Sequence, residues 1–154
     1  MKYIFILLSI IFFTIAQINA SEKQIFQSTK FDRVNVRKGP GLNYNVTHQF
    51  LREGIPLLVK KEFENWKMIE DFEKETGWVS KSQLSNKRYG IILNKESSVK
   101  ILPDTQTKNL ILLKNKVIFE ILKCKVDWCK IKIKKYKGWI KKSDFWGVSE
   151  EEIF

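Results

Sequence analysis

Hydrophobic and polar residues alternate along several short stretches of the chain. Val34 and Val36 are separated by Asn35, and Ile131 and Ile133 are separated by Lys132. A period of two places side chains alternately on the two faces of a strand, so these stretches predict β-strands with one buried face. Largely apolar stretches at 55–59 and 117–122 predict central strands. The chain is therefore expected to be all-β.

Turn-forming residues separate these stretches. They are Lys38-Gly39-Pro40-Gly41 in the first half, and Val126-Asp127 and Lys137-Gly138 in the second. A short helical turn is expected near 80–84 and again near 143–146, in each case capped by a serine.

The same pattern occurs twice. Trp66-Lys67-Met68-Ile69 recurs as Trp128-Cys129-Lys130-Ile131, and Gly77-Trp78-Val79 recurs as Gly138-Trp139-Ile140. The two tryptophan pairs have nearly equal offsets, 62 and 61 positions. We therefore expect two tandem small β-barrels, a first module at 28–85 and a second at 88–148. The junction at 85–88 is short, which predicts modules packed in a fixed orientation.

The N-terminal segment has the features of a signal peptide. Lys2 precedes an apolar run from Tyr3 to Ile15, and small residues end the segment at Ala20. A run of roughly 13 apolar residues is typical of a secretory signal, whereas a membrane-spanning helix needs about 20. Cleavage is expected after Ala20, which gives a signal peptide at 1–20. The alternative is a retained membrane anchor.

The chain is strongly basic. Its 154 residues carry a formal charge of +11, and removal of residues 1–20 with Lys2 leaves +10. This charge favours anionic partners, and export makes nucleic acid the least accessible of them. The strongest basic stretch surrounds Tyr136 and Trp139. Two explanations fit this stretch equally well. The lysines could bind anionic headgroups or acidic polymer, or they could protect an edge strand against aggregation. The stretch consists of Lys132, Lys134, Lys135, Lys137, Lys141 and Lys142.

The two cysteines are close in sequence. Cys124 and Cys129 flank Lys-Val-Asp-Trp, and two strands joined by a short turn would place them opposite each other. In an oxidising compartment they are expected to form a disulfide, with free thiols as the alternative. A metal site would need more ligands, because the only histidine, His48, is distant in sequence. No metal and no cofactor are expected.

The first module resembles a known family. Val34-Asn35-Val36-Arg37-x-Gly39-Pro40-Gly41, followed by a Trp-x-x-Ile segment and Gly77-Trp78-Val79, is similar to the bacterial SH3 domain. The chain as a whole, over roughly 28–148, resembles exported proteobacterial proteins with two such domains. The second module departs from the pattern, with Lys100 aligned to the Asn, Leu102 aligned to the Arg, and the Gly-Pro-Gly missing. On this alignment the second module keeps only the barrel.

The resemblance implies a function. It implies two SH3-like barrels in a non-catalytic, periplasmic protein that binds peptidoglycan, especially its peptide stems. The alternative is a module that binds a periplasmic protein and has no wall ligand. These are inferences from fold, and fold alone does not fix function.

The ligand-binding candidates all lie in the first module and are Tyr44, Arg37, Trp66 and Trp78. Each has a structural alternative. Tyr44 would pack over the turn, Arg37 would fix the turn through a carbonyl or an acid, and the tryptophans would be barrel core. Gly39 and Gly41 are expected to adopt positive φ in a tight turn.

Catalytic residues are not expected. The chain has one histidine and two cysteines, and the acids between 62 and 75 are interspersed with lysines. Such a cluster predicts a solvated hairpin loop rather than a carboxylate pair. His48 is expected to be a surface residue. The C-terminal tail, 150–154, is acidic and expected to fray.

Overall fold

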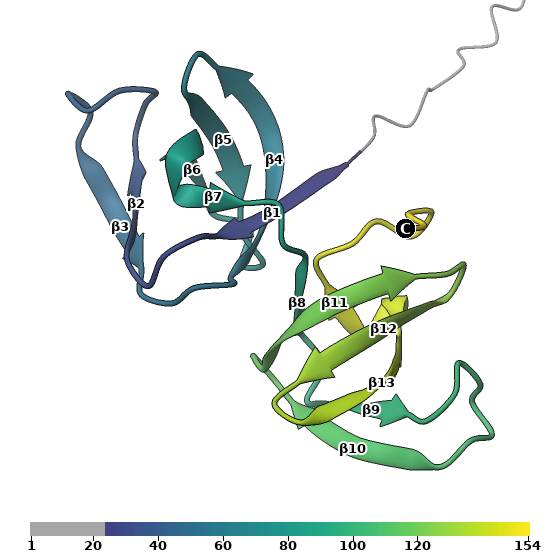
Figure 1. The fold of residues 1–154 in the computed structure, drawn as a ribbon. Coiled ribbons are helices and arrows are strands. Elements are labelled where there is room, and N and C mark those ends of the chain that lie inside the picture. Colours follow the sequence, from purple (N-terminus) through teal and green to yellow (C-terminus); the bar gives the residue numbers. More distant parts are fainter. Residues whose placement is uncertain (1–23) are drawn as a thin grey trace, which may run out of the picture.

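The computed structural model describes residues 24–154. The expected signal peptide lies outside these residues. The first module consists of seven strands in the sheet order β3-β2-β6-β5-β4-β1-β7 (Figure 1). Their bounds are β1 (Ile25–Thr29), β2 (Val34–Arg37), β3 (Val46–Phe50), β4 (Pro56–Phe63), β5 (Trp66–Glu70), β6 (Thr76–Ser80) and β7 (Leu84–Ser85).

The second module repeats this topology seven strands later, in the order β10-β9-β13-β12-β11-β8-β14. All pairings in both sheets are antiparallel. The predicted all-β fold with two tandem SH3-like units is confirmed. The strands are β8 (Tyr89–Ile92), β9 (Glu96–Lys100), β10 (Asn109–Lys114), β11 (Ile118–Cys124), β12 (Trp128–Ile133), β13 (Tyr136–Lys141) and β14 (Phe145–Trp146).

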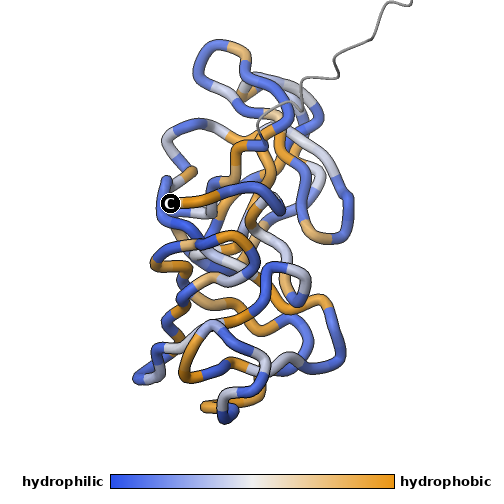
Figure 2. Tube along the Cα trace, turned by 90° about the vertical axis from the view of Figure 1, so that its right-hand side faces the viewer, coloured by the Kyte–Doolittle hydropathy of each residue, from blue (hydrophilic) through white to orange (hydrophobic). Residues whose placement is uncertain are grey.

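Each module has its own hydrophobic core, supplied by alternate residues of the strands. In the first module, Val34 and Val36 of β2 and Val79 of β6 are fully buried. In the second, Ile131 and Ile140 are fully buried beside Cys129. Figure 2 shows hydrophobic and hydrophilic segments alternating along the chain in both modules. The alternation seen in the sequence thus fixes which face of each strand points inward.

Two short 3-10 helices occupy the positions of the expected helical turns. They are η1 (Lys81–Gln83) and η2 (Lys142–Asp144). Ser80 precedes the first but makes no side-chain cap hydrogen bond, and the residue before the second is Lys141. The expectation of serine caps is therefore wrong. Within residues 24–154 no helix is long and apolar enough to cross a membrane.

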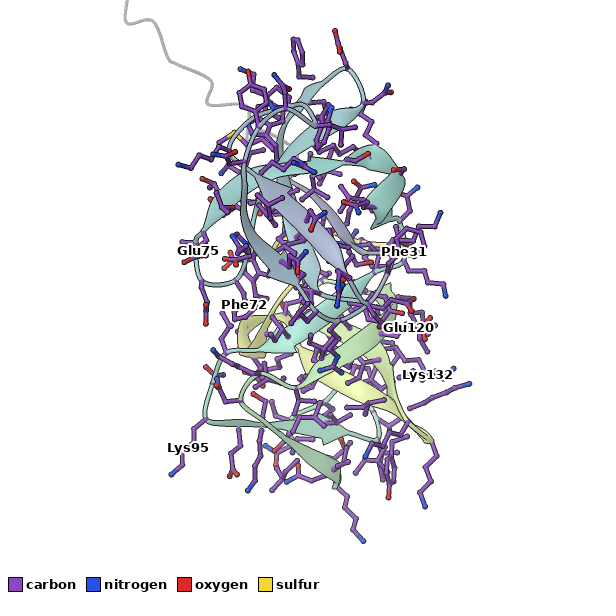
Figure 3. The ribbon with its side chains drawn as sticks, turned by 90° about the vertical axis from the view of Figure 1, so that its left-hand side faces the viewer. Phe31, Phe72, Glu75, Lys95, Glu120 and Lys132 are labelled. Atoms are coloured by element: carbon purple, nitrogen blue, oxygen red, sulfur yellow. A yellow bond between two sulfur atoms is a disulfide. The ribbon has the colours of Figure 1, made fainter. Side chains whose placement is uncertain are left out.

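The modules pack against each other through aromatic and charged side chains. The rings of Phe26 on β1 and Trp146 on β14 meet edge to face, with centroids 5.0 Å apart. Elsewhere at the junction, Lys116 pairs with Glu73 (2.6 Å) and lies 5.6 Å from the ring of Phe72. Figure 3 shows Phe72 at the boundary between the modules. A packed interface, as the short junction predicted, is present.

The C-terminal tail is ordered against the second module, so the expectation of fraying is wrong. The backbone of Phe154 exchanges two hydrogen bonds with Cys124 at the end of β11 (2.8 and 3.3 Å). Arg88 forms an ion pair with Glu152 and lies 5.0 Å from the ring of Phe154. These contacts satisfy the backbone of the last residues and hold the tail in place.

Candidate functional site

The loop after β2 in the first module is held by its own residues. Arg37 donates from Nη1 to the carbonyl oxygens of Leu42 (3.1 Å) and Tyr44 (2.7 Å). The Tyr44 ring covers Gly39, so closely that a Cβ at Gly39 would lie 2.5 Å from it. The expectation that Arg37 fixes the turn through carbonyls is confirmed. Tyr44 packs over the turn and remains 44% exposed.

The expected role of the two turn glycines is wrong. Among the described residues, the glycines with positive φ are Gly54 and Gly147, not Gly39 and Gly41. Gly39 is needed because the Tyr44 ring occupies the space of a side chain, not because the backbone is left-handed.

Lys100 in the second module makes the same contacts as Arg37. Its Nζ donates to the carbonyl oxygens of Thr105 and Thr107, both at 3.1 Å. These carbonyls lie five and seven residues after Lys100, as those of Leu42 and Tyr44 do after Arg37. Each basic residue therefore clamps the loop that follows it.

Cross-strand partners confirm this correspondence. Arg37 pairs with Trp78, and Lys100 pairs with the equivalent Trp139. The backbone bonds of the two loops also match, since Lys38 N to Asn45 O has its counterpart in Ile101 N to Lys108 O. The correct alignment therefore places Lys100 at Arg37 and Pro103 at Pro40. The alignment of Leu102 with Arg37 is wrong by two residues, and the second module has kept the clamped loop.

The tryptophans lie on the outer face of each sheet. In the first module, Trp66 is opposite Ser80 and Trp78 is opposite Met68, and all four are half-buried. Their neighbours in sequence, such as Ile69 and Val79, point into the core. Trp66 and Trp78 are thus not core residues, contrary to that alternative. Trp139 is only 8% exposed, and the ammonium groups of Lys123 and Lys125 lie over its ring.

In the second module the outer face of β11, β12 and β13 combines lysines with two tryptophans, and we call it the lysine–tryptophan face. Lys125 Nζ lies 5.2 Å and Lys123 Nζ 5.7 Å from the centre of the Trp139 ring, and Lys141 Nζ lies 5.7 Å from that of Trp128. Ammonium groups at these distances are attracted by the indole faces. The face consists of Trp128, Trp139, Lys123, Lys125, Lys130, Lys132, Lys137 and Lys141.

The predicted basic stretch belongs only partly to this face. Lys132 is opposite Lys137 and shares the outer face with Lys141. Figure 3 shows Lys132 beside Glu120, its partner at 4.0 Å. Lys134 and Lys135 lie at the exposed turn after β12. The assignment of Lys142 to the basic stretch is wrong, because this residue is only 8% exposed. Its Nζ donates to the carbonyl oxygens of Glu150 and Glu152 (2.7 Å each).

An open hollow of about 720 Å³ adjoins this face. It lies between the loop that Lys100 clamps and the tip of the β11–β12 hairpin. Trp128 and Lys141 belong both to the hollow and to the lysine–tryptophan face. The remaining lining comprises Pro103, Asp104, Thr105, Val126, Asp127, Lys142, Ser143 and Glu150.

The predicted disulfide is present and shapes one wall of the hollow. Cys124 and Cys129 are cross-strand partners at the end of the β11–β12 hairpin and are bonded to each other. The tip is also fixed by Lys125 N to Trp128 O (2.8 Å) and by Lys142 N to Asp127 O (2.9 Å). The side chains of the tip are therefore presented on a rigid support.

The ligand candidates chosen from the sequence lie together, but in the other module. Arg37, Trp78 and Trp66 share the outer face of β2, β6 and β5, beside Tyr44 at the loop. The hollow is formed by the second module. Its Lys141 and Lys142 belong to the predicted basic stretch, whereas Asp127 was not predicted. Aligning Pro103 with Pro40 would have revealed that the second module retains the loop.

A comparison with protein families agrees with this fold. The family model for the bacterial SH3 domain matches the chain twice, at residues 30–86 and 101–147. No curated protein matches the chain.

Similar solved structures include NlpC1 and NlpC2 from Trichomonas vaginalis and an NlpC/P60 family protein from Bacillus cereus ATCC 10987. Their identities are 14, 15 and 11%, with TM-scores of 0.37, 0.37 and 0.36. The matches cover 82, 80 and 80% of this chain and 47, 48 and 57% of those structures, so the chain spans about half their length. On the two matches to the family model, the chain belongs to the bacterial SH3 domain family.

Proposed function

We propose that the protein is an exported, non-catalytic binding protein of the cell envelope, and that it binds peptidoglycan through its peptide stems. Family membership supports a binding role. The proposal rests on the hollow of the second module. Trp128 and Lys141 line this hollow and also belong to the lysine–tryptophan face. The periplasm is the compartment that we propose for it.

The chemistry of this site suits a peptide that bears charges of both signs. The lysines offer partners for carboxylates, and Asp104 and Asp127 in the hollow offer partners for an amine. The half-buried Trp128 offers an apolar surface for aliphatic or sugar groups. Peptidoglycan stems carry carboxylates and amines close to sugar rings, and therefore match all three features.

The test is co-sedimentation of the purified protein with purified peptidoglycan over a salt series. We expect a bound fraction that falls as salt rises but persists, because surface charge is screened whereas apolar contact is not. Trp128→Ala and Lys141→Gln should reduce it. Trp66→Ala is the matched control, since Trp66 is the counterpart of Trp128 in the first module. Circular dichroism would verify that each variant is folded.

Three outcomes would contradict the proposal or its site. Absence of sedimentation at every salt concentration would exclude a wall ligand. Equal sedimentation of the wild type and Trp128→Ala would show that the hollow is not the site. Loss in Trp66→Ala alone would move the site to the first module.

A second candidate function is binding of a periplasmic protein. Strand β10 is an edge of the second sheet, and Leu112 on it is 51% exposed. Ile101 and Leu102, in the neighbouring loop, are 50 and 56% exposed. An edge strand with apolar side chains favours addition of a strand from a partner. This function predicts no sedimentation with peptidoglycan and loss of partner binding in Leu112→Lys.

A further inference from the structure

A histidine and two carboxylates from distant parts of the sequence converge in the first module. His48 lies on β3, and Asp71 and Glu75 lie in the loop between β5 and β6. One potential ligand atom from each residue lies within 4.8 Å of the other two. The sequence predicted that His48 is a surface residue and that the acids form a solvated loop. Both predictions are wrong in part, because His48 is half-buried and Asp71 is only 5% exposed.

The hydrogen bonds of Thr47 determine which nitrogen of His48 carries the proton. The Thr47 hydroxyl donates its single hydrogen to the carbonyl oxygen of Val36 (3.1 Å). Its contact with His48 Nδ1, also 3.1 Å, must therefore be one in which Nδ1–H donates to the hydroxyl oxygen. In neutral His48 the lone pair is then on Nε2.

Nε2 is also the nitrogen that lacks a partner. It is buried, and it makes no hydrogen bond within residues 24–154. A buried nitrogen lone pair without a donor is unfavourable unless something else satisfies it. The ring itself is held edge to face against Phe50, with centroids 5.3 Å apart, so Nε2 has a defined position.

The Asp71 carboxylate also has a defined position, which backbone hydrogen bonds give it. Its Oδ1 accepts hydrogen bonds from the backbone N–H groups of Glu73 (2.8 Å) and Glu75 (2.9 Å). The loop is closed further by Asp71 N to Glu75 O (3.0 Å). Because both amides bond to Oδ1, they orient the carboxylate and leave Oδ2 for a ligand.

We propose that His48, Asp71 and Glu75 bind a divalent transition metal ion, with Zn²⁺ as the best-matched ion. One imidazole nitrogen and two carboxylate oxygens form a ligand set that Zn²⁺ accepts. Metal-bound histidines ordinarily donate their other N–H to an oxygen, as His48 donates to Thr47. Tetrahedral Zn²⁺ places its ligand atoms about 3.3 Å apart. The exposed Glu75 side chain has the freedom to close the remaining distance. A water molecule would complete the coordination.

The experiment uses the fact that His48 is the only histidine of the chain. The imidazole ¹⁵N and ¹H signals of a tag-free, chelator-treated protein therefore belong to this residue without further assignment. Zn²⁺ titration should shift the Nε2 signal with saturation at one equivalent, and calorimetry should give the same stoichiometry. Before Zn²⁺ is added, the neutral ring should be the Nδ1–H tautomer.

Matched variants separate this site from surface binding. Glu75→Gln and His48→Gln should weaken Zn²⁺ binding by about tenfold or more. Glu73→Gln removes the same charge from the same loop but lies outside the ligand set, and should bind like the wild type. The proposal is overturned if excess Zn²⁺ leaves the His48 signals unchanged. It is equally overturned if Glu75→Gln and Glu73→Gln bind Zn²⁺ as the wild type does. An Nε2–H tautomer in the neutral ring would contradict the Thr47 argument.

Discussion

Lys100 in the second module occupies the position of Arg37 in the first. Each pairs with the tryptophan of the neighbouring strand, and each donates to carbonyl oxygens five and seven residues further along. The flexible ammonium of Lys100 replaces the rigid fork of Arg37, and a Leu-Pro-Asp turn replaces Gly-Pro-Gly. The clamp is therefore common to both loops, whereas the requirement for Gly39 is confined to the first loop, where Tyr44 covers it.

The clamp predicts that Lys100→Met destabilises the second module. The variant loses two hydrogen bonds from a charged donor, and we expect the free energy of unfolding to fall by about 1 kcal/mol. Urea unfolding measures this, and amide exchange should increase within residues 101–108. Lys108→Met is the control, because that exposed lysine lies at the end of the same loop. Equal stability of the two variants would refute a clamping role for Lys100.

The disulfide predicts sensitivity of the hollow to reduction. A bond between Cys124 and Cys129, five residues apart, limits the unfolded chain only over a short loop. The loop-entropy relation then gives a stabilisation of about 2 kcal/mol. Unfolding with and without a reductant measures it. The double variant Cys124→Ala/Cys129→Ala should be less stable and unaffected by the reductant. If reduction changes neither the wild-type unfolding free energy nor its peptidoglycan binding, the bond does not support the hollow.

Glu62 is predicted to titrate far below an ordinary glutamate. Hydrogen bonds from Lys67 (2.7 Å) and Lys81 (2.8 Å) lower the pKa of its carboxyl from 4.5 to about 2. Because the folded pKa is the lower one, the contribution of Glu62 to stability is present above pH 4.5 and is lost as the pH falls toward 2. The side chain is exposed, so the effect on stability should be small.

NMR titration of the Glu62 carboxyl carbon tests this directly. Lys81→Met should raise the pKa of Glu62 toward its ordinary value. Lys61→Met, a change at an exposed neighbour, should leave it low. A wild-type midpoint near the ordinary glutamate value would show that these lysines do not hold the carboxylate in solution.

Arg88 is predicted to hold the tail and the module junction together. Its guanidinium pairs with Glu152, donates to the carbonyl oxygen of Gly147 (2.9 Å) and lies 5.7 Å from the ring of Phe26. The Arg88 and Glu152 side chains are each 17% exposed, so removing one leaves the other poorly solvated. We expect Arg88→Met to cost about 2 kcal/mol of unfolding free energy and to expose residues 150–154 to proteases. Arg33→Met, at an exposed arginine, should do neither.

The sequence by itself determined the elements, the repeat and the disulfide. Period-two alternation identifies strands and their inner faces, and it is the reason why Lys132, Lys137 and Lys141 share one surface. The spacing of Cys124 and Cys129 around a turn made them cross-strand partners. These features are local, and local geometry follows from residues a few positions apart.

Only the tertiary structure decided the register of the repeat and the members of the sites. A slip of two residues keeps every inward side chain inward, so alternation cannot distinguish Lys100 from Leu102 as the counterpart of Arg37. The cross-strand pairing of Lys100 with Trp139 identifies Lys100 as that counterpart. Burial of Lys142 depends on the returning tail, and the approach of His48 to Asp71 and Glu75 depends on the sheet that brings β3 beside the β5–β6 loop. Such contacts join residues far apart in the chain, where no periodic signal connects them.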